Sequence, residues 1–139
     1  MKPAEDLKKS DATRQRILDS AARVLSRDGF AGAKLSDIAA EARLKVATLY
    51  YYYDSREALV EAVMVTGSEH VRQHSLAALA ELPDSCAPLE RLCVAVESHL
   101  RFVLEISNYT QAVIRNAGQV PENVRSSLSS EINQYGRLW

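Results

Sequence analysis

The sequence predicts an all-α protein, and three observations carry that prediction. The 139-residue chain has 47% hydrophobic residues but only 5 Gly and 4 Pro, a composition that suits packed helices. Apolar residues recur at three- and four-residue spacing over most of the chain, which is the period of an amphipathic helix. Gly29, the Asp54-Ser55 pair and Pro83 interrupt this pattern, as helix ends do.

The first helix is expected from about Ala12 to Asp28. Gly29 follows it at the place where a left-handed residue often ends a helix, and Phe30 can pack back on the last turn. Residues 1–11 are polar and are expected to form a mobile arm.

Two short helices, at about Leu35–Ala42 and Val46–Tyr52, are expected next, with a tight turn between them. Their apolar residues fall on one buried face. A helix pair of this kind forms a helix-turn-helix motif, whose second helix enters the major groove of DNA. Small residues allow close approach, while lysine and tyrosine can bind phosphate oxygens. The outward positions around the second helix are Lys45, Val46, Ala47, Thr48, Tyr50 and Tyr51.

Residues 13–60 resemble the DNA-binding domain of the TetR family of bacterial repressors. The matching stretches are TRQRILDSAARVLSRDGF, LSDIAAEA and ATLYYYYDSREALV. The resemblance implies an all-α, TetR-like fold, with a helix-turn-helix DNA-binding domain at residues 12–56 and a helical effector and dimerisation domain at residues 57–139. The DNA-binding residues that it implies are Lys34, Ser36, Lys45, Val46, Ala47, Thr48, Tyr50, Tyr51 and Arg56.

Three positions depart from the family pattern. Lys34 and Lys45 stand where a Ser or Thr usually caps a helix, and a lysine cannot accept a backbone N–H. Arg43 occupies a turn position where the family usually has Gly, so it must tolerate strain if the turn is left-handed. Each departure adds a cation near the expected DNA path. Either they tune the affinity for DNA or they have drifted at exposed positions.

The charge distribution agrees with this organisation. Residues 1–56 carry 11 Lys/Arg against 8 Asp/Glu, a balance of +3, whereas residues 57–139 carry 6 against 10, a balance of −4. A positive excess in the helix-turn-helix part suits a partner such as double-stranded DNA.

The fourth helix is expected from Arg56 to about Leu82, with Ser55 as its cap. At ~1.5 Å per residue it would be roughly 39 Å long, enough to join two domains. His70 and His74 share one face of this helix and could bind a metal. Because no third ligand is evident, a packed or solvated pair is the stronger interpretation. No metal and no cofactor are therefore expected.

Three more helices are expected to begin near Pro88, Tyr109 and Pro121. The family resemblance implies that helices four to seven enclose a cavity for a small-molecule effector. Their apolar character fits a hydrophobic ligand and fits ordinary packing equally well. The apolar stripe of the fifth helix comprises Leu89, Leu92, Cys93, Val96, Leu100, Val103 and Leu104. The candidate residues lining the cavity are Phe102, Tyr109, Arg115, Asn116 and Tyr135.

Cys86 and Cys93 are expected to be reduced thiols, because at helical spacing they lie too far apart to form a disulfide. No secretory signal and no apolar run of membrane-spanning length is visible. A cytoplasmic protein without membrane contact is expected.

The chain stops at Trp139 within a periodic helical pattern, and we expect a truncated or naturally shortened form of the family. The function predicted from the resemblance is a transcriptional repressor. It would bind a palindromic operator as a homodimer and be released by a small-molecule effector. The alternative is a helical protein-interaction module that has lost DNA binding. An enzyme that uses His70 and His74 with a metal ranks last, because no pairing of a nucleophile with a general base, no Gly-rich phosphate loop and no acidic dyad accompanies them.

Overall fold

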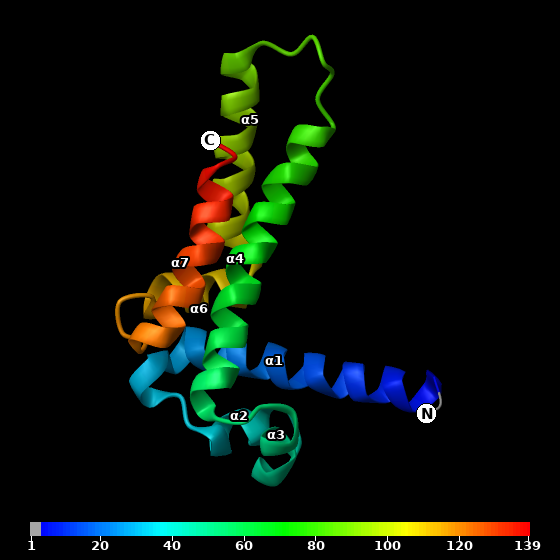
Figure 1. The fold of residues 1–139 in the computed structure, drawn as a ribbon, viewed down its shortest axis with the longest axis vertical. Coiled ribbons are helices and arrows are strands. Elements are labelled where there is room, and N and C mark those ends of the chain that lie inside the picture. Colours follow the sequence, from blue (N-terminus) through cyan, green and yellow to red (C-terminus); the bar gives the residue numbers. More distant parts are fainter. Residues whose placement is uncertain (1–3) are drawn as a thin grey trace.

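A computed structural model describes residues 4–139 and the side chains of residues 7–104 and 107–139. Within this part of the chain every regular element is a helix, which confirms the predicted fold class (Figure 1). A π-helix, η1, separates the fifth and sixth α-helices. The elements are α1 (Ala4–Gly32), α2 (Leu35–Glu41), α3 (Val46–Tyr52), α4 (Arg56–Ala80), α5 (Pro88–Arg101), η1 (Phe102–Ile106), α6 (Asn108–Asn116) and α7 (Glu122–Gly136).

The first helix begins at Ala4, eight residues before the expected start. The expectation of an arm over residues 1–11 was therefore wrong for residues 4–11, while residues 1–3 lie outside the described part. Alanine, leucine, lysine and glutamate, which dominate this segment, are all good helix formers. At the other end Gly29 has φ 76° and breaks the helix, as its sequence position predicted. A final turn follows the break.

The predicted short helices are confirmed to within one residue; α2 packs on α1, and α3 packs on α2. Ile38 and Ala39 of α2 and Leu49 of α3 are almost completely buried in the hydrophobic core that also contains the apolar face of α1. Burying such side chains stabilises the domain by ~1.5–3 kcal/mol for each large one. The arrangement leaves the opposite side of α2 and α3 open to solvent.

The fourth helix is the central element of the fold. It begins as predicted, with the Ser55 hydroxyl accepting the Ala58 N–H at 3.0 Å. It packs against α1, α5, α6 and α7, and it runs from the helix-turn-helix end of the molecule to the opposite end (Figure 1). Because α4 has neighbours around most of its circumference, small residues such as Gly67, Ser68 and Ser75 are buried along it.

The apolar stripe of α5 does not face the core. Leu89 is 71% exposed, and Leu92, Val96 and Leu100 are exposed as well. Leu104, which the sequence assigned to the same stripe, lies in η1 and is 68% exposed. The helix instead buries Ala95 and Ser98 against α4, because small side chains let the two helices approach closely. The apolar period located the helix correctly but did not identify the face that packs on α4.

None of the helices in residues 4–139 combines the length and the apolar character that crossing a membrane requires.

Candidate nucleic-acid interface and effector cavity

The turn between α2 and α3 fixes the orientation of α3. The Arg43 N–H donates to the Ala40 carbonyl at 3.0 Å, and the Leu44 N–H donates to the Ala39 carbonyl at 2.9 Å. This pair of bonds is a Schellman motif, in which the first residue after the helix is left-handed. Arg43 occupies that position with φ 55°, so the strain expected from the sequence is confirmed. A left-handed non-glycine residue costs ~1–2 kcal/mol.

The exposed face of α3 carries most of the predicted DNA-binding set. Leu49 points into the core, while Tyr50 and Tyr51 are 53% and 69% exposed. Lys45 and Ala47 are exposed, and Val46 and Thr48 are half-buried. The structure therefore brings a lysine, a small residue and two tyrosines together on one protruding helix, which is a surface that a groove of DNA can accept.

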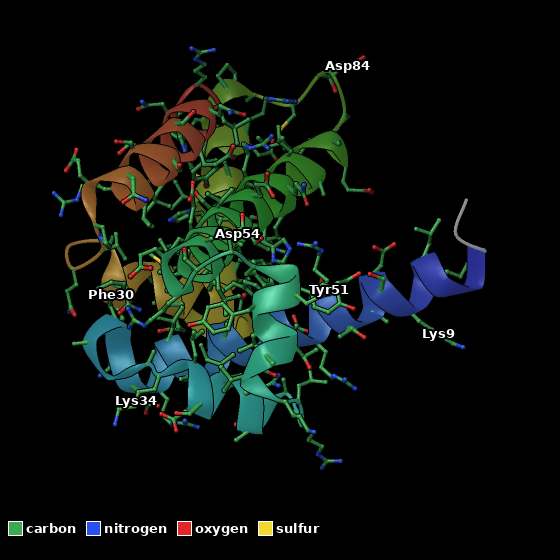
Figure 2. The ribbon with its side chains drawn as sticks, turned by 60° about the horizontal axis from the view of Figure 1, so that its bottom comes forward. Lys9, Phe30, Lys34, Tyr51, Asp54 and Asp84 are labelled. Atoms are coloured by element: carbon green, nitrogen blue, oxygen red, sulfur yellow. The ribbon has the colours of Figure 1, made fainter. Side chains whose placement is uncertain are left out.

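The start of α2 adds two exposed side chains, Lys34 and Ser36. Neither Lys34 nor Lys45 makes a side-chain cap bond, as their chemistry predicted. Figure 2 looks onto this end of the molecule, with Lys34 at the start of α2 and Tyr51 near the end of α3. Lys34, Arg43 and Lys45 are all exposed, so the three cationic departures from the family pattern remain available to phosphate.

The other two tyrosines of the run hold α3 on α1. The Arg14 guanidinium lies 5.6 Å from the ring centroid of Tyr52 and 5.3 Å from that of Tyr53. It also donates to the Tyr52 carbonyl at 3.4 Å. Burial raises the pKa of the Tyr53 hydroxyl, so this group stays neutral. Tyr52 and Tyr53 are half-buried and therefore have a structural role.

Arg56 is half-buried, and its guanidinium binds backbone groups near the end of α1 instead of being free for the predicted phosphate contact. Its Nε donates to the Ala33 carbonyl at 2.9 Å, and its Nη2 donates to the Phe30 carbonyl. The guanidinium also lies over the Phe30 ring, 4.4 Å from the centroid. The predicted phosphate contact of Arg56 is therefore corrected: carbonyls near the end of a helix lack partners within that helix, and this guanidinium supplies them.

A cavity of about 250 Å³ lies among α4, α5, α6 and α7. Of the five residues predicted to line it, only Tyr135 does so. Thr110, Val113 and Ile114 place one face of α6 on the cavity, and a helix cannot present its opposite face to the same space. The lining residues are Gly67, Ser68, Val71, His99, Val103, Thr110, Val113, Ile114, Ile132 and Tyr135.

The other four predicted residues lie elsewhere. Phe102 packs on His74, with 4.7 Å between ring centroids. Tyr109 is buried and donates its hydroxyl to Asp19 of α1. Arg115 and Asn116 also bind α1, through backbone groups near its break. One feature of the sequence does point to the residues that line the cavity. Glycine at position 67, inside a long helix, marks a place where another backbone comes close.

One corner of the cavity is polar. His99 Nδ1 and the Tyr135 hydroxyl are 2.8 Å apart, and that hydroxyl lies 3.1 Å from the Ser75 Oγ. Burial lowers the pKa of His99, so the imidazole is held neutral. The remaining walls are dominated by Val71, Val103 and other apolar side chains. Such a cavity can hold a mostly apolar molecule that carries a polar group at one end.

His70 and His74 each pack on an aromatic ring. The ring centroids of His70 and Tyr109 are 5.2 Å apart, and those of His74 and Phe102 are 4.7 Å apart. Among the residues that the structure describes, no group of three or more His, Cys, Asp or Glu is arranged to hold a metal ion.

Comparison with known proteins gives consistent results. Residues 17–63 match the family model for bacterial regulatory proteins of the tetR family. An uncharacterised HTH-type transcriptional regulator of Mycobacterium tuberculosis (strain H37Rv) is 33% identical over 96 residues, which are 69% of this chain and 46% of that protein. The negative transcriptional regulator IcaR of the Staphylococcus aureus biofilm operon icaADBC is 26% identical over 133 residues, covering 88% of this chain and 68% of IcaR.

The fold is also similar to that of AibR, solved in complex with isovaleryl coenzyme A and operator DNA. The TM-score is 0.78 at 22% identity, covering 88% of this chain and 65% of AibR. The chain thus spans about half the length of the mycobacterial regulator and about two thirds of IcaR and AibR. The matched segment contains the complete α2–α3 motif described above. The chain belongs to the TetR family of bacterial transcriptional regulators.

Proposed function

We propose that the chain is a sequence-specific DNA-binding transcriptional regulator that acts as a repressor. The observation that carries this proposal is the exposed face of α3, where Lys45, Tyr50 and Tyr51 surround the small residue Ala47. On this proposal α3 lies in the major groove, and Lys34 and Lys45 bind phosphates on either side of it. The name of IcaR, a negative regulator, supports repression, and the operator complex of AibR supports a DNA partner.

The partner of α3 is proposed to be a palindromic operator bound by a homodimer, since one helix-turn-helix motif reads only one half-site. Because its proposed partner is bacterial DNA, we propose that the chain works in the cytoplasm. We propose no catalytic activity for it. Arg56 is left out of the proposed contacts because it binds the Phe30 and Ala33 carbonyls.

The cavity among α4–α7 is proposed to bind the small-molecule effector. Its volume of about 250 Å³ and its apolar walls favour a compact hydrophobic molecule. His99 and Tyr135 would bind a hydrogen-bonding group of that molecule. AibR, which has a similar fold, is described with an acyl coenzyme A. We propose that the effector releases the DNA by favouring a form of the protein in which the two recognition helices no longer match the half-sites.

The test is DNA binding by the variants Lys45→Ala and Tyr50→Phe, on a duplex that the wild-type chain selects from a random library. We expect each to lose ~3–10-fold in affinity, because each removes one phosphate contact of ~0.5–1.5 kcal/mol. Lys45→Ala is also expected to reduce the slope of log affinity against log salt by about one. Arg137→Ala, at the exposed end of α7, is the matched control for lost charge.

Unchanged affinity in both variants would refute the assignment of these contacts. If the wild-type chain selects no duplex from the library, and any residual affinity for DNA does not fall with salt, the chain is instead a helical protein-interaction module.

A further inference from the structure

The last turn of α6 is tied to the break in α1 by a buried amide. Asn116 has no exposed surface. Its Oδ1 accepts the Phe30 N–H at 2.5 Å, and its Nδ2 donates to the Leu25 carbonyl at 3.2 Å. Gly29, with φ 76°, lies between those two positions. One side chain of α6 therefore holds both sides of the α1 break.

Arg115 adds a second connection at the same place. Its Nη1 donates to the Ser26 carbonyl at 2.9 Å and to the Arg27 carbonyl at 2.5 Å. Carbonyls at a helix end lack partners within the helix, and Arg115 supplies them. A Cβ on Gly29 would lie 3.3 Å from the Arg115 Nε, so glycine also gives this side chain its space.

The connection continues from the break to the helix-turn-helix motif. Phe30, whose N–H binds Asn116, also offers its carbonyl to Arg56. Arg56 in turn binds the carbonyl of Ala33, two residues before α2 begins. A continuous set of polar contacts thus runs from the end of α6 to the start of α2 and α4. In Figure 2, Phe30 and Lys34 mark this region, on the same side of the molecule.

The opposite face of α6 forms a wall of the cavity through Thr110, Val113 and Ile114. Beside the cavity, α4 and α6 are in close contact at Gly67. A Cβ added to Gly67 would lie 2.7 Å from the Tyr109 carbonyl oxygen and 2.9 Å from the Val113 Cγ2. A group that enters this contact separates α6 from α4, because packed helices shift as units rather than compress.

We propose that Arg115 and Asn116 are positioning residues that transmit a displacement of α6 to the recognition motif through the break at Gly29. A ligand in the cavity shifts α6, the two side chains shift the end of α1, and Phe30, Arg56 and Ala33 shift the start of α2. This inference rests on the proposed function, in which the cavity holds an effector and α3 binds DNA. It assigns signal transfer to the α6–α1 contact in addition to the long helix α4.

The test uses Gly67→Ala as a ligand substitute, because its methyl group must push α6 away from α4. We expect Gly67→Ala to lower affinity for the selected duplex by ~10-fold, within the range of typical allosteric couplings. Gly118→Ala, whose added Cβ meets nothing within 4 Å, is the matched control and should leave affinity unchanged. In an Arg115→Ala/Asn116→Ala background the same Gly67→Ala change should alter affinity less than ~2-fold, since the sites are then uncoupled.

Equal losses from Gly67→Ala in both backgrounds would overturn the proposal, as would no loss in the wild-type background. If Asn116→Ala does not fold, Arg115→Ala alone serves, because that side chain is exposed. If Gly67→Ala does not fold, Ile132→Trp replaces it, since Ile132 lines the cavity and is 48% exposed.

Amide hydrogen exchange at residues 30–36 gives a readout that does not depend on DNA. We expect Gly67→Ala to accelerate exchange there, and the added Arg115→Ala to remove that acceleration. Failure of the wild-type chain to bind any duplex would refute the proposed function while leaving this comparison intact. Identical exchange with and without the Arg115 side chain would refute the coupling itself.

Discussion

Replacing Asn116 with alanine tests how much the buried amide stabilises the fold. The side chain is fully buried, and it bonds to the Phe30 N–H and the Leu25 carbonyl of α1. Alanine removes this partner from both groups in a site closed to water. Each buried group left without a hydrogen bond lowers the free energy of unfolding by ~1–3 kcal/mol. Allowing for partial relaxation, we expect a loss of ~2–4 kcal/mol in the free energy of unfolding. For a chain of this size that is a drop on the order of 10 °C in Tm.

The assay is urea unfolding followed by circular dichroism, with a thermal scan alongside. Asn123→Ala is the matched control, because Asn123 is exposed on α7 and its loss should change stability by less than ~0.5 kcal/mol. A loss below ~1 kcal/mol for Asn116→Ala would refute the reasoning, since it would mean that water or a relaxed backbone satisfies the α1 groups equally well.

Two further predictions concern the turn and the cavity. Arg43→Gly should raise the free energy of unfolding by ~0.5–1 kcal/mol, because glycine adopts φ 55° without strain. The same change should weaken DNA binding and its dependence on salt, because it removes one cation. A lower free energy of unfolding for Arg43→Gly in urea would contradict the expected gain in stability. Burial lowers the pKa of His99 below its usual 6.5, so below that pH the unfolded chain takes up a proton that the folded chain does not, and stability falls. His99→Gln should reduce the fall in Tm between pH 7.5 and 5.5, and an unchanged difference would refute this account.

Local chemistry was enough to predict the helix-turn-helix region from the sequence. The boundaries of α2 and α3, the break at Gly29, the left-handed Arg43 and the Ser55 cap are all as expected. Each depends on interactions within a few residues of chain, where backbone sterics and single side-chain bonds decide the conformation. The apolar period also located most of the longer helices, but it missed the start of α1 by eight residues.

The positions that the tertiary structure decided are those where a helix has two plausible faces. The apolar stripe of α5 is exposed while Ala95 and Ser98 pack on α4. Sequence reasoning placed Arg115 and Asn116 in a cavity, whereas they bind the end of α1.

The sequence by itself determined the fold class, the recognition motif and the identity of the residues on the exposed side of α3. Only the tertiary structure decided which α6 face lines the cavity and that Arg56 turns inward to the Phe30 and Ala33 carbonyls. The physical reason is the distance along the chain over which each interaction acts. Caps, turns and helical periods are set by neighbours in sequence, while the partner of a polar side chain is set by whichever unpaired group the packing of distant helices brings within reach.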